Sequence, residues 1–357
     1  MVSMNDVDSP PPGKLSDLGR QETTTALFEQ LLASHRQELY EHCYRMLGSV
    51  QDAEDALQES LLAVWRGVAK FEGRSSLRTW LYRVTTHACL RLIARRPRRM
   101  LSVDSAPPRQ ATDDLGEPLT GPIWLEPWPD REANETGGPD PAASYLRRES
   151  VELAFIATLQ CLPGKQRAVL ILREVLDFSA AEVARILETT PAAVNSALQR
   201  ARKAVAQRMP ATTQQAELAA LGADGRKALA EAFVTAWERS DIAAILELLA
   251  DDARFSMAPL PGWFLGREEV GRFFTERIFA TPWRLVPIRA NGQLAFACYQ
   301  GEPGGKRFPL GAINVVSLRG GRIVEITGFV DPDMHRHFGL PDEFPVAGDS
   351  IPTDEPK

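Results

Sequence analysis

The sequence is poor in the side chains that build metal sites and disulfides, because its 357 residues contain only four cysteines and five histidines. Cys43, Cys89, Cys161 and Cys298 lie far apart, and neither a Cys-x-x-Cys motif nor a paired histidine accompanies them. This usage is typical of reduced structural thiols, not of disulfides or zinc ligands. We therefore expect no metal site and no cofactor.

Long hydrophobic runs are missing as well. No stretch reaches about eighteen apolar residues, and residues 1–14 contain neither the basic nor the apolar segment of a secretion signal. We expect a soluble, cytoplasmic protein. A length of 357 residues predicts two or three domains, each able to bury a core.

Excess positive charge is also absent, since the net charge is −6. Evenly spread, this charge would argue weakly against nucleic-acid binding. The distribution is uneven, however. Acidic residues gather at 52–59, residues 66–109 carry a net charge of roughly +9, and residues 110–140 carry roughly −7. Neighbouring blocks of opposite sign are hidden in the total.

Helical periodicity marks the first blocks. Apolar residues recur at threes and fours over 25–47, and Gly48 ends that helix. Ser49 can cap the next helix, with Asp52 approximating the second half of a capping box. A third helix carries Trp80 among arginines and a histidine on one face. This face suits single-stranded nucleic acid, because guanidiniums meet phosphates while the ring stacks on an unpaired base. A solvated basic face is the alternative.

A second helical block, over 143–207, ends in a helix-turn-helix pattern. Ser179 and Glu182 form a capping box before one short helix, and Thr190 and Pro191 start another after a tight turn. Asparagine, glutamine and arginine on the outer face of the last helix can read base edges in a major groove. A helical hairpin with polar tips is the alternative.

From Gly225 to about Leu340 the pattern predicts an α+β domain, in which helices precede an antiparallel sheet. A hairpin turn is expected at 319–322. The expected strands cover 253–257, 284–290, 294–300, 313–318 and 323–329, and a helix covers 267–278. Most of the large apolar side chains are expected in the core, and the candidates for a pocket lining are Met257, Trp263, Trp283, Tyr299 and Phe329.

Four motifs stand in order over residues 25–208. They are His42-Cys-Tyr-Arg-Met-Leu-Gly48, Asp52-Ala-Glu-Asp-Ala-Leu-Gln-Glu59, Phe71-Glu-Gly-Arg-Ser-Ser-Leu-Arg-Thr-Trp-Leu-Tyr-Arg83 and Val194-Asn-Ser-Ala-Leu-Gln-Arg-Ala-Arg202. Together they resemble the extracytoplasmic-function (ECF) sigma factors of bacterial RNA polymerase. Residues 122–130, 258–263, 283–287 and 289–293 are similar to the subgroup with a C-terminal SnoaL-like domain.

The resemblance implies a multidomain fold class of two all-α sigma domains, one helical and one with a helix-turn-helix, followed by an α+β NTF2-like cone-shaped domain. The implied bounds are 1–23 for a disordered lead, 24–99 for sigma domain 2, 100–142 for an acidic linker, 143–208 for sigma domain 4, 209–223 for a second linker, 224–340 for the SnoaL-like domain and 341–357 for a tail.

The resemblance also implies an alternative sigma factor that binds core RNA polymerase and directs promoter recognition, promoter melting and transcription initiation, with no catalytic residue. The acidic helix would dock on the clamp helices of the largest polymerase subunit through Asp52, Glu54, Asp55, Gln58, Glu59, Leu62 and Trp65. The basic helix and the loop before it would capture the melted minus-ten strand through Ser75, Ser76, Arg78, Trp80, Tyr82, Arg83, His87, Arg91 and Arg95.

The helix-turn-helix would read the minus-thirty-five element, near the flap of the second-largest subunit. Its implied contacts are Thr190, Ala192, Asn195, Ser196, Gln199, Arg200, Arg202 and Lys203. The sequence departs from the family pattern here, because Glu188 replaces the usual turn glycine. Asn195 and Ala197 stand where lysine or arginine is often found, which leaves the promoter sequence open.

Two segments remain. The acidic linker fits the sigma segment that enters the polymerase cleft, and we hypothesise that it also folds back on the basic helix and masks it. The SnoaL-like domain is expected to pack against one or both sigma domains and to regulate them in cis. Asp251, Asp252, His335 and His337 are its possible acid–base groups, and none is clearly placed in a pocket. The alternatives are a ligand-sensing transcriptional regulator and a bifunctional protein with its own small-molecule activity.

Overall fold

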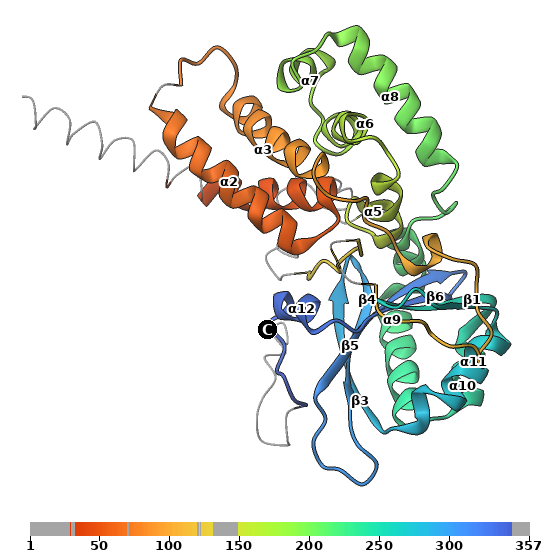
Figure 1. The fold of residues 1–357 in the computed structure, drawn as a ribbon. Coiled ribbons are helices and arrows are strands. Elements are labelled where there is room, and N and C mark those ends of the chain that lie inside the picture. Colours follow the sequence, from red (N-terminus) through yellow and green to blue (C-terminus); the bar gives the residue numbers. More distant parts are fainter. Residues whose placement is uncertain are drawn as a thin grey trace, which may run out of the picture.

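The computed structural model describes residues 33–69, 71–119, 123–130 and 149–344, together with Glu29 and Gly121. Two helical units sit side by side on one end of a sheet unit (Figure 1). We call residues 33–99 the N-terminal helical unit, residues 100–130 the linker, residues 149–208 the second helical unit and residues 214–344 the sheet unit. The expected lead, 1–23, and most of the expected tail lie outside the described residues.

Three helices build the N-terminal helical unit: residues 33–47, α2 (Val50–Val68) and α3 (Leu77–Ile93). Gly48 ends the first with a φ of +69°, a left-handed conformation that favours glycine. Ser49 caps α2, as predicted, and its side chain accepts from the Asp52 amide at 3.0 Å. Arg95 was expected on the same helix as Trp80, but α3 ends at Ile93 and Arg95 lies in the turn that follows.

The second helical unit contains α5 (Leu153–Gln160), α6 (Gly164–Leu170), a π-helical turn η3 (Ile171–Val175), α7 (Ala180–Ile186) and α8 (Pro191–Ala206). The predicted helix starts are confirmed. Ser179 and Glu182 form a reciprocal capping box, and Thr190 accepts from the Ala193 amide to cap α8. The α7–α8 pair is therefore the expected helix-turn-helix.

The sheet unit begins with α9 (Gln214–Glu238), which bends at Gly222, and α10 (Ile242–Leu248). Its strands are β1 (Leu249–Ala258), β2 (Trp263–Leu265), β3 (Trp283–Ala290), β4 (Gln293–Gln300), β5 (Leu310–Arg319) and β6 (Arg322–Phe329). α11 (Arg267–Glu276) and the 3₁₀ turn η4 (Ile278–Ala280) separate β2 from β3. After β6 come α12 (Pro332–His335) and η5 (Arg336–Phe338).

The strand order is β2-β1-β6-β5-β4-β3, and β1 pairs with β6 in parallel. The expectation of a wholly antiparallel sheet is therefore wrong for this pair. The chain crosses from the β1–β2 edge to the far edge through α11 and returns by the β3–β6 meander, which brings β6 beside β1 in the same direction. Asp251 and Asp252, expected at a helix end, lie within β1.

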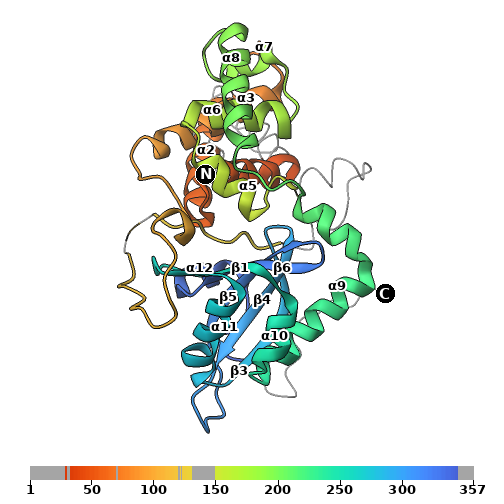
Figure 2. The same cartoon turned by 90° about the vertical axis from the view of Figure 1, so that its right-hand side faces the viewer.

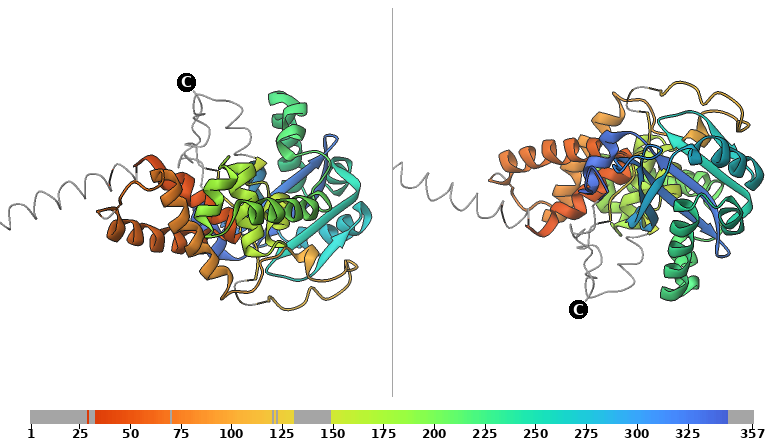
Figure 3. Two further views of the ribbon diagram at one scale, coloured as in Figure 1. Left: turned by 90° about the horizontal axis from the view of Figure 1, so that it is seen from above. Right: turned by 90° about the horizontal axis from the view of Figure 1, so that it is seen from below.

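The two faces of the sheet have different covers (Figure 2). Helices α9, α10 and α11 close one face over a core that includes Phe233, Trp237 and Phe274. On the other face, Val315 and Phe329 belong to the same buried cluster as the helical units. Seen from above, the second helical unit lies beside the N-terminal helical unit (Figure 3). The three units therefore share a continuous apolar contact.

No helix in the described part of the chain is long and apolar enough to span a bilayer.

Candidate nucleic-acid and protein interfaces

The acidic face of α2 is open to solvent. Glu54 is half-buried, and Asp55, Gln58, Glu59, Leu62 and Trp65 are exposed. Leu62 and Trp65 are two of the four large apolar side chains that are exposed among the described residues, at 56% and 38%. Exposed apolar groups rimmed by carboxylates are typical of a docking surface for a partner with basic and apolar groups.

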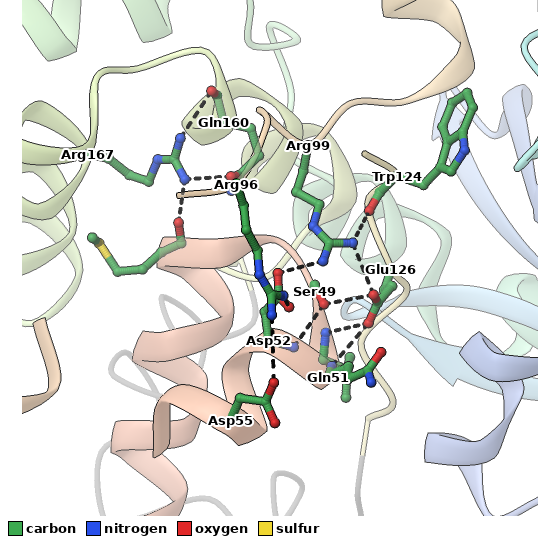
Figure 4. Close-up of polar contacts among 12 residues, drawn as sticks. Ser49, Gln51, Asp52, Asp55, Arg96, Arg99, Trp124, Glu126, Gln160 and Arg167 are labelled. Atoms are coloured by element: carbon green, nitrogen blue, oxygen red, sulfur yellow. Dashed lines mark hydrogen bonds and ion pairs between the residues drawn. The ribbon is translucent and has the colours of Figure 1, made fainter. Parts of the chain in front are cut away.

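Asp52 is different, because it is only 3% exposed and lies in a buried ionic network (Figure 4). Arg99 donates to Asp52 at 2.5 Å, and Arg96 forms a second ion pair with it. The structure therefore places this predicted polymerase contact inside the protein, where its charge is compensated by two guanidiniums. Burial lowers the pKa of Arg99, while the neighbouring Glu126 opposes that effect.

Glu126, from the linker, completes this network and caps α2. Its carboxylate accepts from the Ser49 hydroxyl at 2.7 Å and from the amides of Val50 and Gln51 at 2.8 and 3.1 Å. It also accepts from Arg99 at 3.1 Å. An anion at a helix N-terminus is stabilised by the free amides and the helix dipole. The expected capping role of Asp52 thus belongs to Glu126, 77 residues beyond Ser49.

The predicted strand-capturing residues on and around α3 lie in several environments. Ser76 caps α3 and Trp80 is half-buried against Phe71, with ring centroids 5.3 Å apart. Tyr82 is 1% exposed. Ser75, Arg78 and His87 are intermediate, and Arg83, Arg91 and Arg95 are exposed.

The second helical unit covers much of this face. Arg78 donates to the Leu176 carbonyl at 2.9 Å and stacks over the Phe178 ring at 4.1 Å. Tyr82 meets Phe178 edge to face, with centroids 5.1 Å apart.

Two further polar contacts complete this cover. Arg83 pairs with Glu188 at 2.5 Å, and His87 Nε2 lies 3.0 Å from the Ile186 carbonyl. An α3 residue outside the contact, Arg91, pairs with Glu59 of α2 at 2.6 Å.

The linker was expected to mask α3, and its described residues do not do so. They pack instead on the start of α2, on the 33–47 helix, where Trp128 lies against Tyr40 and Tyr44, and on the sheet unit. The segment 124–129 is buried and mostly apolar, which explains this placement. Exposing this segment would cost more free energy than the linker carboxylates would gain beside the arginines of α3. Residues 131–140 of the same hypothesis lie outside the described part.

The helix-turn-helix presents its predicted base-reading side outward. All eight residues named for it, Thr190, Ala192, Asn195, Ser196, Gln199, Arg200, Arg202 and Lys203, are exposed. The buried Val194 and Leu198 hold α8 from the other side. Glu188, in the turn, has a φ of +53°, the conformation in which a glycine is less strained.

Asn291, at the tip of the β3–β4 hairpin, joins the sheet unit to both helical units and to the linker. Fully buried, it donates to the Tyr44 hydroxyl at 2.8 Å and to the Val151 carbonyl at 2.7 Å, and accepts from the Trp128 amide at 2.9 Å. These partners belong to the N-terminal helical unit, the second helical unit and the linker. Its left-handed φ of +56° also suits asparagine.

Glu152 ties the second helical unit to α9. It accepts from the Gln215 amide at 2.8 Å while only 2% exposed. Burial raises the pKa of Glu152 to about 7, although the hydrogen bonds from the α9 amides oppose that rise.

The five pocket candidates of the sheet unit are buried in its packing. Trp283 is in the helix-covered core, Phe329 faces the helical units, and the Trp263 indole donates to the Ala106 carbonyl at 2.6 Å. Met257 and Tyr299 are buried too. Three cavities, of about 580, 600 and 310 Å³, are lined by other residues. His335, one of the possible bases, has a pKa lowered by burial, and its Nε2 lies 2.7 Å from the Phe329 carbonyl.

Comparisons with known proteins match every unit. Residues 31–99 match the family model for sigma-70 region 2, residues 152–205 that for sigma-70 region 4, and residues 230–326 that for the SnoaL-like domain. The chain is 39% identical over 314 residues to the ECF RNA polymerase sigma factor SigG of Mycobacterium tuberculosis, across 86% of this chain and 82% of that protein.

A second sequence relative and a solved structure also match. ECF RNA polymerase sigma factor SigW of Bacillus subtilis is 24% identical over 178 residues, which cover 50% of this chain and 86% of that protein. The crystal structure of the extracytoplasmic function sigma factor SigJ of Mycobacterium tuberculosis shares the fold with a TM-score of 0.57, at 22% identity, over 89% of this chain and all of that one.

Proposed function

Since the chain belongs to the extracytoplasmic-function sigma factors of bacterial RNA polymerase, we propose that it binds core polymerase, directs it to a promoter and opens that promoter. It acts in the cytoplasm, where its partners are core polymerase and promoter DNA. This work consists of binding steps, so the sigma part needs no catalytic residue. The SnoaL-like sheet unit regulates the process in cis.

Core polymerase docks on the open face of α2. Asp55 and Glu59 supply charge complementarity to the clamp helices of the largest subunit, which steers association. Gln58 supplies a polar contact, and Leu62 and Trp65 supply apolar contact. Asp52 supports this face from beneath, because its pairs with Arg96 and Arg99 hold the start of α2.

Promoter DNA is held at two places. The α3 face captures the melted minus-ten strand, with Trp80 stacking on a base, and a stack of this kind contributes about 1–3 kcal/mol. The outer face of α8 reads the minus-thirty-five element in the major groove, beside the flap of the second-largest subunit. The free chain has α8 exposed and α3 partly covered.

The described arrangement is the closed, inactive form of the factor. The observation that carries this proposal is the contact of Phe178 and Leu176 with Arg78 and Tyr82, which occupies the strand-capturing face. The sheet unit holds the closed form through Asn291, which hydrogen-bonds both helical units and the linker at once. Opening by polymerase then frees α3.

Core-polymerase pull-down followed by run-off transcription tests the sigma function. We expect Asp55→Arg to lose core binding, while Glu268→Arg, the same charge change at an exposed position of α11, retains it. Trp80→Ala is expected to keep core binding and to lose open complex about tenfold or more. Failure of the wild-type chain to retain core polymerase would refute the proposal.

A further inference from the structure

The contact between the two helical units contains a buried arginine without an acidic partner. Arg167 of α6 is 4% exposed, and its guanidinium donates to the carbonyls of Met46, Gln160 and Leu162. Among the described residues no carboxylate forms an ion pair with it. Burial lowers the pKa of Arg167 to about 10. A buried cation that has only dipoles around it is costly, so this site favours a negative charge.

Unused donors lie beside this cation. The Arg167 Nε and the Gln160 Nε2 are both buried and have no hydrogen-bond partner among the described residues. Gln160 is 3% exposed, and its side-chain oxygen already accepts from Arg167 (Figure 4). An unsatisfied buried donor costs about 1–3 kcal/mol, so two in one place need an explanation.

Both residues line a cavity of about 310 Å³ between the helical units. The N-terminal helical unit lines it with Leu47, with Asp52 of α2 and with residues of the 92–99 segment. The second helical unit lines it with residues 160–164 and Arg167. Four of the lining residues are arginines, Arg96, Arg98, Arg99 and Arg167, and the acidic one is Asp52.

The charges that surround the cavity leave a positive excess. Arg96 and Arg99 are compensated by Asp52, with Asp55 and Glu126 behind them. Arg98 is weakly compensated, because its nearest carboxylate, Asp104, is 3.9 Å away. Its guanidinium instead donates to the Cys161 sulfur at 3.0 Å. Arg98 and Arg167 are therefore the two cations that a ligand can pair.

We propose that this cavity binds a small oxyanion of the phosphate class, held by Arg98 and Arg167 with the Gln160 amide as an additional donor. Guanidiniums pair with phosphoryl oxygens through charge-assisted hydrogen bonds, and a cavity near the lower limit for small-molecule sites suits an anion of orthophosphate or diphosphate size. Such an anion supplies the missing charge and satisfies both unused donors.

The ligand stabilises the closed form, because its site exists only while the two helical units touch. By mass action, a ligand that binds one form shifts the equilibrium toward it. This consequence rests on the closed form that we proposed above, whereas the binding itself does not. The phosphoryl group belongs either to a free inorganic anion or to a nucleotide.

Titration calorimetry of the full chain with sodium pyrophosphate, in a phosphate-free buffer at constant ionic strength, tests the site. We expect one saturable site in the wild type. We expect the affinity of Arg98→Gln for pyrophosphate to be at least tenfold lower, since a charge-assisted hydrogen bond is lost. Arg98 is about half-exposed, so this variant keeps its fold. The control is Arg272→Gln on α11, an arginine of similar exposure, and we expect wild-type binding.

Parallel titrations with orthophosphate and ADP show whether the bound phosphoryl group belongs to an inorganic anion or to a nucleotide. ADP binds as tightly as pyrophosphate only if the cavity admits a nucleoside. Absence of saturable binding, or equal binding by the Arg98→Gln and Arg272→Gln variants, overturns the proposal. The affinity of the chain for single-stranded DNA, with and without pyrophosphate, separately tests the effect on closure. We expect pyrophosphate to weaken it in the wild type and not in Arg98→Gln.

Discussion

Truncation of Phe178 to alanine removes an aromatic contact between the second helical unit and α3. Phe178 is 1% exposed, touches the Tyr82 ring edge to face and lies beneath the Arg78 guanidinium. It is not one of the residues assigned to DNA. The substitution therefore weakens the closed form and leaves the proposed strand contacts intact.

The magnitude follows from the two ring contacts. An aromatic pair and a cation–π contact contribute about 1 kcal/mol each, so closing becomes about 2 kcal/mol less favourable. This change raises the ratio of open to closed molecules about thirty-fold. The apparent affinity for a single strand rises by the same factor while the closed form predominates, because only the open fraction binds.

Fluorescence anisotropy with a short labelled single strand of random sequence measures that affinity. Phe178→Leu, which keeps apolar volume and loses both ring interactions, is the matched variant and is expected to give most of the gain. Circular dichroism checks that the second helical unit stays folded. Unchanged affinity in a folded Phe178→Ala chain would show that this contact does not limit access to α3, and the closed form would lose its main support.

Substitutions at three further residues test the contacts between the units. Asn291→Gly keeps the left-handed turn and removes three hydrogen bonds, so we expect a lower thermal midpoint and tighter single-strand binding. Asn291→Ala should lower the free energy of unfolding by about 1 kcal/mol more than Asn291→Gly, because alanine is strained at this left-handed φ. Equal thermal midpoints of the two variants would contradict this expectation. Glu126→Gln should destabilise the chain by about 2–3 kcal/mol in calorimetric unfolding, because Arg99 and the N-terminus of α2 lose their anion. A thermal midpoint equal to that of the wild type would show that Glu126 does not stabilise the fold. Glu152 has a raised pKa in the folded chain, near 7, so the folded form binds more protons than the unfolded form between pH 4.5 and 7, and stability falls as pH rises through that window. Glu152→Gln should therefore match the wild type near pH 5 and exceed it at pH 8 by on the order of 3 kcal/mol, and a gain independent of pH would refute the assignment.

Local signals predicted the helices and hairpins well. The Ser179 and Glu182 box, the Thr190 cap and the 319–322 turn each depend on neighbours within a few residues, and all three are present. The same reasoning failed at Asp52, because the arginines that bury it lie some 44 to 47 residues away and its capping role passes to Glu126.

Long-range placement was the part that the sequence could not supply. The acidic linker expected over 100–142 carries eight acidic residues within 110–140, and that charge suggested α3 as its partner. Its Trp124 to Trp128 segment is apolar on both sides of Glu126, and burial of that segment decides where the described linker lies. Asn291 was visible only as part of a matched motif. Nothing in its neighbours reveals that a hairpin tip meets three other segments.

The firm contacts that hold the closed form depend on residues that are not proposed to bind DNA. Arg78, Arg83 and His87 serve both the closed contact and the proposed strand contact, so their closed partners must be easy to displace. Arg83 and Glu188 are each half-exposed, and such a pair contributes about 0–1 kcal/mol. The firm contacts of closure are instead Phe178 and Asn291, which have no proposed role in DNA binding. Changes at Phe178 or Asn291 should therefore alter how readily the factor opens while preserving promoter choice, whereas changes at Arg83 alter both.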